Sequence, residues 1–241
     1  MIISTFNFTY FLFLLLLAII TVVLSIIFKN KSQKAKDTLI VSMGIFNIIL
    51  FIVYKYFLSI DGYDFIIWKE LPLQLCNINM FIIPLGVILN NKYLKTFGFY
   101  IGPLAAIMAI TFPEEGFTDN NIFLMRNIGF YGTHGIIVIK GILLLSLGYV
   151  ELKFKDIINL FAITIPLSLA IFLVNILFFN ITGVETNYFF TMHPSTVSLL
   201  HAFYNLIPIK YLYLLPAAAI LIVYVVIVNC VKVAYYKVKK R

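Results

Sequence analysis

Seven long stretches of almost uninterrupted apolar residues dominate the sequence, at residues 10–28, 38–58, 71–89, 96–112, 127–148, 157–179 and 211–231. At a rise of about 1.5 Å per residue, helices of this length cross the roughly 30 Å hydrocarbon core of a membrane. The membrane core offers no water to the backbone, so each stretch must satisfy its own hydrogen bonds as a helix. We therefore expect an all-α fold, a polytopic membrane helix bundle with seven transmembrane helices.

The composition of the chain agrees with a membrane protein and excludes several other classes. Of the 241 residues, 62% are hydrophobic and 12% are charged, whereas about a quarter of the residues in a soluble domain are charged. Soluble enzymes, nucleic-acid-binding modules and disordered scaffolds are therefore excluded, and we expect no nucleic-acid partner. No soluble domain, low-complexity segment or repeat interrupts the pattern, so we expect a single transmembrane domain over residues 1–241.

The basic residues predict the orientation of the chain across the membrane. Thirteen lysines and arginines fall in the C-terminal tail and in the loops after the first, third and fifth apolar stretches, whereas the other loops hold three, Lys69, Arg126 and Lys210. Cytoplasmic loops carry the excess of positive charge. We therefore expect a multi-pass protein of the cell membrane with its N-terminus outside and its C-terminus inside. The net charge of +8 is assigned to contacts with membrane lipids.

Polar side chains inside the apolar stretches indicate where a site could lie, because each costs free energy in hydrocarbon unless it finds a partner. They include Gln74, Cys76, Asn77 and Asn79 in the third stretch, and Arg126, His134 and Lys140 at the start of and within the fifth. Counted at helical rise from the outer surface, Cys76 lies roughly 8 Å deep and His134 roughly 10 Å deep. The two side chains could therefore meet in the outer leaflet, where a histidine could activate the thiol as a nucleophile.

Packing roles compete with function at the same positions. A lone cysteine in a membrane helix is usually a small packing residue, and amide side chains commonly join helices. Lys55 and Lys140 could extend their ammonium groups toward the nearer interface. No cluster of ligands has the spacing of a metal site and no phosphate-binding glycine loop occurs, so we expect no metal and no cofactor. Cys230 falls at the opposite side of the membrane from Cys76, which excludes a disulfide between them.

Three short motifs resemble the YwaF family of bacterial integral membrane proteins. They are Leu-Pro-Leu-Gln-Leu-Cys-Asn at 71–77, Tyr-Gly-Thr-His-Gly at 131–135 and Asn-Tyr at 187–188, and the resemblance extends from about residue 70 to 231. That family is similar to an animal transmembrane acyltransferase that moves fatty acyl chains onto ether lysophospholipids. The resemblance implies that Cys76 is the acyl-accepting nucleophile and His134 the base. It also implies substrate-binding roles for Asn187 and Tyr188.

The residues themselves suggest further parts of such a site. Gln74 or Asn77 could donate a hydrogen bond to the oxyanion, and Arg126, on one stripe with His134, could hold a lipid headgroup. Gln74 stands where the family usually has a histidine, and His193-Pro194 stands where it usually has Lys-Pro.

Two other classes of function stay open. The first is a transporter or accessory membrane subunit with a polar path lined by Gln74, Asn79, His134 and Lys140. The second is a structural protein, packed against another membrane protein or a further copy of the chain. The connection at residues 180–210 lies outside and is apolar, so we expect it to fold back with a short amphipathic helix around 195–204.

Overall fold

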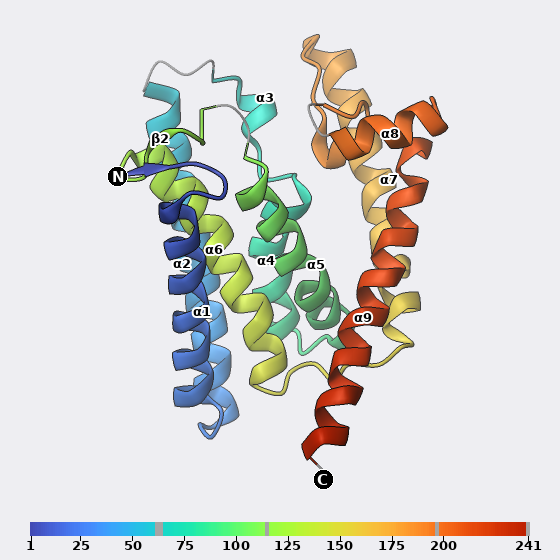
Figure 1. Cartoon of the computed structure of the whole chain (residues 1–241). Helices are drawn as coiled ribbons and strands as arrows, with labels where there is room; N and C mark the ends of the chain where they lie inside the picture. Colours follow the sequence, from blue (N-terminus) through green and yellow to red (C-terminus); the bar gives the residue numbers. More distant parts are fainter. Residues whose placement is uncertain (61–64, 114–115, 196–197, 240–241) are drawn as a thin grey trace. The chain divides into compact units, whose positions relative to one another are not determined.

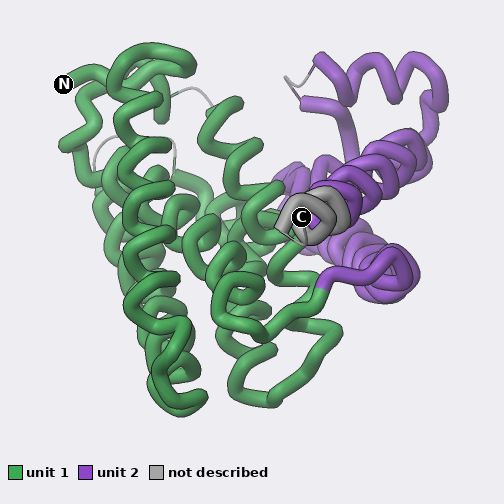
Figure 2. The backbone as a smooth tube through the Cα atoms, turned by 60° about the horizontal axis from the view of Figure 1, so that its bottom comes forward, with its two compact units in different colours: residues 1–151 green, residues 152–241 purple. Residues whose placement is uncertain are grey.

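The computed structural model describes residues 1–60, 65–113, 116–195 and 198–239, with side chains described up to residue 232. Almost every ordered element in these residues is a helix (Figure 1). The chain forms two compact units, Met1–Glu151 and Leu152–Arg241 (Figure 2). The prediction of a single transmembrane domain over the whole chain stays a prediction.

Unit 1 contains six helices, which are α1 (Phe8–Phe28), α2 (Gln33–Ile60), α3 (Ile67–Glu70), α4 (Leu75–Ile88), α5 (Lys92–Thr111) and α6 (Met125–Ser146). All but α3 run side by side, and α6 packs against α1, α2, α4 and α5 (Figure 1). Two strands of two residues each, β1 (Ile2–Ile3) and β2 (Asn120–Asn121), pair antiparallel. They join the N-terminus to the segment before α6.

Six helices among the described residues are long and apolar enough to cross a membrane, so the chain is a multi-pass membrane protein. They are α1, α2, α5, α6, α7 (Asp156–Thr182) and the helical stretch Leu212–Lys232. The predicted span at 71–89 instead forms α4, whose 14 residues reach only about 21 Å at helical rise. Pro72 disfavours helix at the preceding residue, and Leu71 is accordingly extended. The count of seven and the orientation therefore stay predictions.

Close packing in unit 1 relies on glycines that receive side chains from neighbouring helices. A Cβ at Gly129 of α6 would lie 2.0 Å from Cβ of Tyr54 on α2, and one at Gly141 would lie 2.5 Å from the ring of Pro103 on α5. No side chain larger than hydrogen fits at such a distance without movement. The glycines of α6 thus let α2 and α5 approach it closely, as small residues at helix interfaces of membrane proteins generally do.

Unit 2 contains α7, the 3-10 helices η1 (Tyr188–Phe190) and η2 (Leu212–Leu214), and the helices α8 (Ser198–Leu206) and α9 (Leu215–Lys239). The short helix predicted around 195–204 is found as α8, which lies across the ends of α7 and α9 (Figure 1). The segment before α8 folds back on α7. The buried Asn175 of α7 donates to the Tyr188 carbonyl at 3.0 Å and accepts from the Thr186 hydroxyl at 2.8 Å.

Candidate functional site

The structure brings Cys76 and His134 into contact. Cys76 lies in the first turn of α4, and its Sγ is 3.3 Å from Nε2 of His134 on α6. The other ring nitrogen, Nδ1, lies 2.7 Å from the backbone carbonyl oxygen of Phe130. The imidazole is 3% exposed, whereas Cys76 is only partly buried. The sulfur side of the contact is therefore less enclosed than the imidazole side.

The Phe130 carbonyl determines which nitrogen of His134 can accept a proton. A carbonyl oxygen can only accept a hydrogen bond, so Nδ1 must carry the hydrogen that it donates to Phe130. In the neutral imidazole, Nε2 then presents its lone pair to the thiol of Cys76. This is the arrangement in which a histidine can take a proton from a cysteine.

Aromatic rings limit the access of water to the histidine. The Phe130 ring lies 4.5 Å from the imidazole, centroid to centroid, and its own ring stacks on Phe117 at 4.6 Å. The hydroxyl of Tyr131 donates to the Phe117 carbonyl at 3.1 Å, which ties the stacked ring to α6. Aromatic side chains therefore border the imidazole of this contact on one side.

The start of α4 favours a negative charge on Cys76. The first turn of a helix carries the positive end of the helix dipole, and a thiolate is stabilised there. Gln74 is the N-cap residue of α4, and Asn77 is buried next to the sulfur. The Cys76 thiol can also donate to Oδ1 of Asn77, at 3.9 Å. Both amide residues predicted for the site thus flank Cys76.

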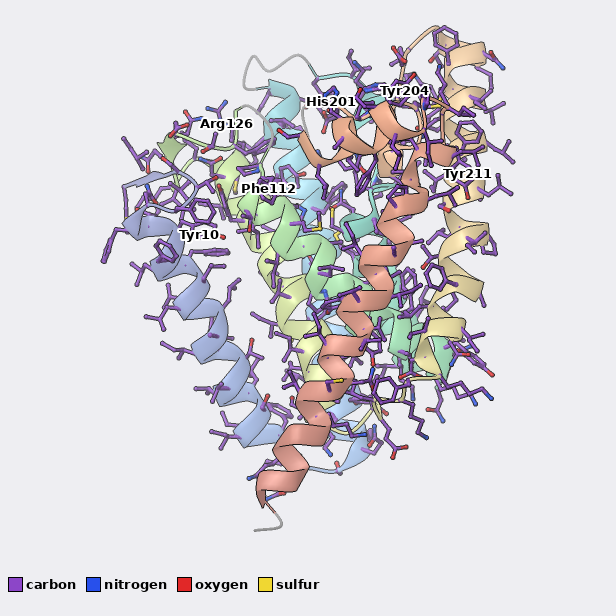
Figure 3. The ribbon with its side chains drawn as sticks, turned by 45° about the vertical axis from the view of Figure 1, so that its right-hand side comes forward. Tyr10, Phe112, Arg126, His201, Tyr204 and Tyr211 are labelled. Carbon is purple, nitrogen blue, oxygen red and sulfur yellow. The ribbon has the colours of Figure 1, made fainter. Side chains whose placement is uncertain are left out.

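Arg126 lies at the start of α6, on the helix that also carries His134. It begins α6 together with Met125 (Figure 3), eight residues before His134, which is about 12 Å along the helix. Its Nε is buried and has no hydrogen-bond partner among the described residues. Arg126 therefore remains a candidate for a group bound at the N-terminal end of α6.

Asn187 and Tyr188 belong to unit 2, where both hold the segment before α8. Nδ2 of Asn187 donates to the carbonyl oxygen of His193 at 2.9 Å, and Oδ1 accepts from the backbone N–H of Met192 at 3.0 Å. Tyr188 is 1% exposed, and its backbone bonds Asn175. These contacts explain both residues structurally, and their part in a substrate site stays a prediction.

The sequence did not reveal an ion pair between Lys55 of α2 and Glu70 of α3. The Lys55 ammonium pairs with Glu70 and lies 4.7 Å from the centre of the Tyr54 ring, and the expectation that it extends toward the interface stays a prediction. The available signal was a single lysine in the second apolar stretch and an acid directly before the Leu71-Pro72 motif. Neither of them identified the other as its partner.

The Lys140 side chain stays inside the helix bundle of unit 1. It is completely buried, and its ammonium donates to the backbone carbonyl of Met80 on α4 at 3.5 Å. That carbonyl has no helical partner because the residue four positions later, Pro84, has no N–H. Two buried amides, Asn47 on α2 and Asn79 on α4, also have side-chain atoms without a hydrogen-bond partner among the described residues.

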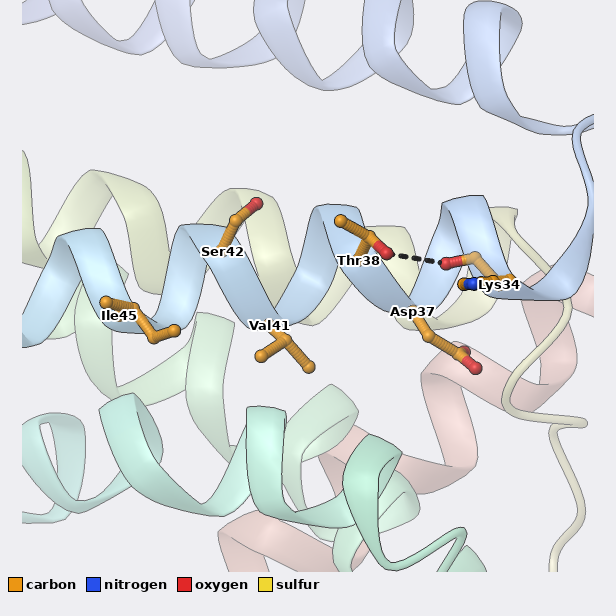
Figure 4. Close-up of a pocket in the computed structure, with 6 residues that line it drawn as sticks. All are labelled: Lys34, Asp37, Thr38, Val41, Ser42 and Ile45. Carbon is orange, nitrogen blue, oxygen red and sulfur yellow. Dashed lines mark hydrogen bonds between the residues drawn. The ribbon is translucent and has the colours of Figure 1, made fainter.

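A pocket of about 350 Å³ lies on α2, away from the cysteine (Figure 4). It is lined by Lys34, Asp37, Thr38, Val41, Ser42 and Ile45. Two of its polar side chains are bonded within unit 1. The Thr38 hydroxyl donates to the Lys34 carbonyl at 2.8 Å, and Asp37 accepts from the Tyr149 hydroxyl at 2.6 Å. This pocket therefore offers less chemistry than the contact between Cys76 and His134.

The comparison with known families identifies the chain. The model of the TMEM164 family matches residues 2–229, which is nearly the whole sequence and includes Cys76 and His134. No curated protein and no solved structure matches the chain. A match of this extent, on a chain with six helices long enough to span a membrane, shows the family. This multi-pass membrane protein belongs to the TMEM164 family.

Proposed function

We propose that the protein is an acyltransferase of the cell membrane that moves a fatty acyl chain between phospholipids through a thioester on Cys76. The contact between Sγ of Cys76 and Nε2 of His134, at 3.3 Å, carries this proposal. The resemblance of the surrounding motifs to the YwaF family, and through it to an animal ether-phospholipid acyltransferase, supports the same assignment. A thiol next to an imidazole with a free lone pair is the pairing that nucleophilic catalysis requires.

The reaction would proceed in two balanced steps. In the first, His134 takes the proton of the Cys76 thiol, the thiolate attacks the ester carbonyl of a phospholipid, and the lysophospholipid leaves with the proton from His134. In the second, the hydroxyl of an acceptor lysophospholipid gives its proton to His134 and attacks the thioester. The new ester forms, and the proton returns to the Cys76 sulfur. Gln74 or Asn77 would donate to the oxyanion of both tetrahedral intermediates.

We propose that the site lies in the outer leaflet. This follows if α4 crosses the membrane as a seventh span, with the N-terminus outside and the C-terminus inside. The distribution of 13 basic residues against three supports this orientation. The Arg126 guanidinium, about 12 Å outward of His134 along α6, would then lie at the depth of a phosphate headgroup. A substrate-binding role for Asn187 and Tyr188 is proposed from the resemblance of their motif alone.

Labelling by a reactive acyl-lipid probe tests the enzyme directly. All variants carry Cys230→Ser, because Cys230 is exposed and could react on its own. We expect Cys76→Ser to lose nearly all labelling and lipid turnover, and His134→Ala to lose most of both. Cys230→Ser alone should behave like the unmodified protein. If folded Cys76→Ser protein keeps its lipid turnover, the proposed enzyme is excluded.

The buried polar residues favour a transporter as the second candidate. Lys140, Asn47 and Asn79 place a cation and unpaired amide atoms inside unit 1, as a path for a small polar solute would require. In liposomes, a transporter should carry solute flux that Lys140→Met reduces and Cys76→Ser leaves unchanged. Lipid turnover that Cys76→Ser abolishes and Lys140→Met leaves unchanged would favour the enzyme.

A further inference from the structure

The ion pair of Lys55 and Glu70 lies at the same end of unit 1 as Cys76. Glu70 closes α3 and stands six residues before Cys76, so the pair fixes the segment that leads into α4. The Lys55 ammonium lies 4.7 Å and 5.4 Å from the centres of the Tyr54 and Phe51 rings. Two aromatic faces and one carboxylate therefore hold this cation in a single position.

Helix packing brings the cation close to the level of His134. Tyr54, next to Lys55, contacts Gly129 of α6, and Leu50 contacts Gly132. The two helices therefore run antiparallel, and Phe51 lies at the level of the turn of α6 that precedes His134. The Lys55 ammonium lies 5.4 Å from the centre of this ring. It therefore belongs to the surroundings of the thiol and imidazole contact.

We propose that Lys55 and Glu70 are positioning residues that set the reactivity of the Cys76 thiol. The positive charge of Lys55 stabilises the thiolate across the low-dielectric interior. Glu70 holds this charge in place and partly cancels it. The proposal deepens the proposed function and rests on it in one respect, the role of Cys76 as the nucleophile.

Other charged groups on the helices packed against α4 do not replace this pair. On α6, Arg126 lies about 12 Å outward of His134, and Lys140 lies about 9 Å inward. On α5, the buried Lys95 lies in the first turn, next to the C-terminal end of α4, where it donates to Asn90 at 2.8 Å. Among the described residues, Lys55 and Glu70 thus form the ion pair that adjoins the entry to α4.

The rate of alkylation of Cys76 measures thiolate formation without any lipid substrate. In the Cys230→Ser background, Cys76 is the only thiol of the chain, so a small maleimide reports on it alone. At neutral pH we expect Lys55→Met to slow alkylation by about fivefold, and Glu70→Gln to speed it by a similar factor. The rise of the rate with pH should move to higher pH in the first variant and to lower pH in the second. Lys55→Arg should restore the original profile.

Changes of opposite sign distinguish an electrostatic role from a structural one, because simple loosening of the site would shift both variants in the same direction. Lys69→Met is the matched control, since it removes the same charge from an exposed residue of α3 and should leave the rate unchanged. Equal rates in all variants, or shifts of the same sign, overturn the proposal. If Lys55→Met does not fold, Glu70→Gln decides alone, because only faster alkylation agrees with the proposal.

The two proposals fail in different measurements. Lipid turnover that survives Cys76→Ser excludes the enzyme, whatever the alkylation rates are. Alkylation rates that ignore Lys55 and Glu70 exclude the positioning role, even when Cys76→Ser abolishes turnover.

Discussion

Single backbone carbonyls determine the hydrogen bonds of two buried side chains of α6, His134 and Lys140. The Phe130 carbonyl orients His134 by accepting from Nδ1, and the Met80 carbonyl receives the Lys140 ammonium. From the sequence, Cys76 and His134 could be predicted to lie at one depth, because helical rise alone sets depth. The partners of Lys55 and Lys140 could not be predicted, because they depend on which helices are neighbours and on how each is rotated.

A tyrosine outside the membrane spans predicts how stability depends on pH. Burial and the hydrogen bond to Asp37 hold the pKa of Tyr149 well above its ordinary value of about 10. The unfolded chain therefore loses this proton at a lower pH than the folded protein does. Because the folded state then binds more protons, the free energy of unfolding should fall as pH rises above about 10.

Tyr149→Phe tests this contribution, because it removes the ionisable hydroxyl and keeps the ring. The variant should be less stable than the unmodified protein at neutral pH by about 1 kcal/mol, and its stability should fall less between pH 10 and 11. Thermal unfolding in detergent across this range measures both effects. A parallel decline of the two proteins with pH would contradict the prediction.

The elements follow the apolar pattern of the sequence except where proline or very short pairing intervenes. Each of the six long spans could be predicted within a few residues, because hydrophobic length is a property of the local sequence. The extended conformation of Leu71 agrees with the effect of Pro72 on the residue before it, and α4 begins only at Leu75. The strands β1 and β2 could not be found, since two residues in each carry no periodic pattern.

The contact of α2 with α6 gives a sharp prediction about packing. Gly129→Ala would place a methyl group 2.0 Å from Cβ of Tyr54, so α2 and α6 must move apart at a cost of about 1–3 kcal/mol. Gly132→Ala is the control, because its methyl group meets the end of the flexible Leu50 side chain at 2.9 Å. Chemical unfolding in detergent should show a clearly larger loss of stability for Gly129→Ala. Equal losses in both variants would mean that the close approach is not rigid.

At the scale of the whole molecule, the number of crossings decides where the termini lie. An odd number of spans places the two ends of the chain on opposite sides of the membrane, and an even number places them on the same side. Six crossings, without the 14-residue α4, would place both termini on one side, whereas seven, with α4, would place them on opposite sides. The 13-to-3 distribution of basic residues favours seven crossings.

Reporters at both ends of the chain measure this parity. We expect a tag before Met1 to be reached from outside and a reporter after Arg241 to be reached only from inside. A reporter inserted at Asn91, in the connection between α4 and α5, should also be reached only from inside. Two termini on one side would show that α4 does not cross, and would remove the basis for placing Cys76 in the outer leaflet.

The bond between Lys140 and the Met80 carbonyl also has a consequence for how the chain enters the membrane. A lysine at the centre of a span costs about 2.5–3.5 kcal/mol when its helix inserts alone. Pro84 leaves this acceptor on α4 without its helical N–H partner, and α4 is synthesised before α6. The order of synthesis thus delivers the acceptor first. Insertion of α6 becomes coupled to the earlier helix, and Pro84→Ala, which lets residue 84 bond Met80 itself, would uncouple the two during biogenesis.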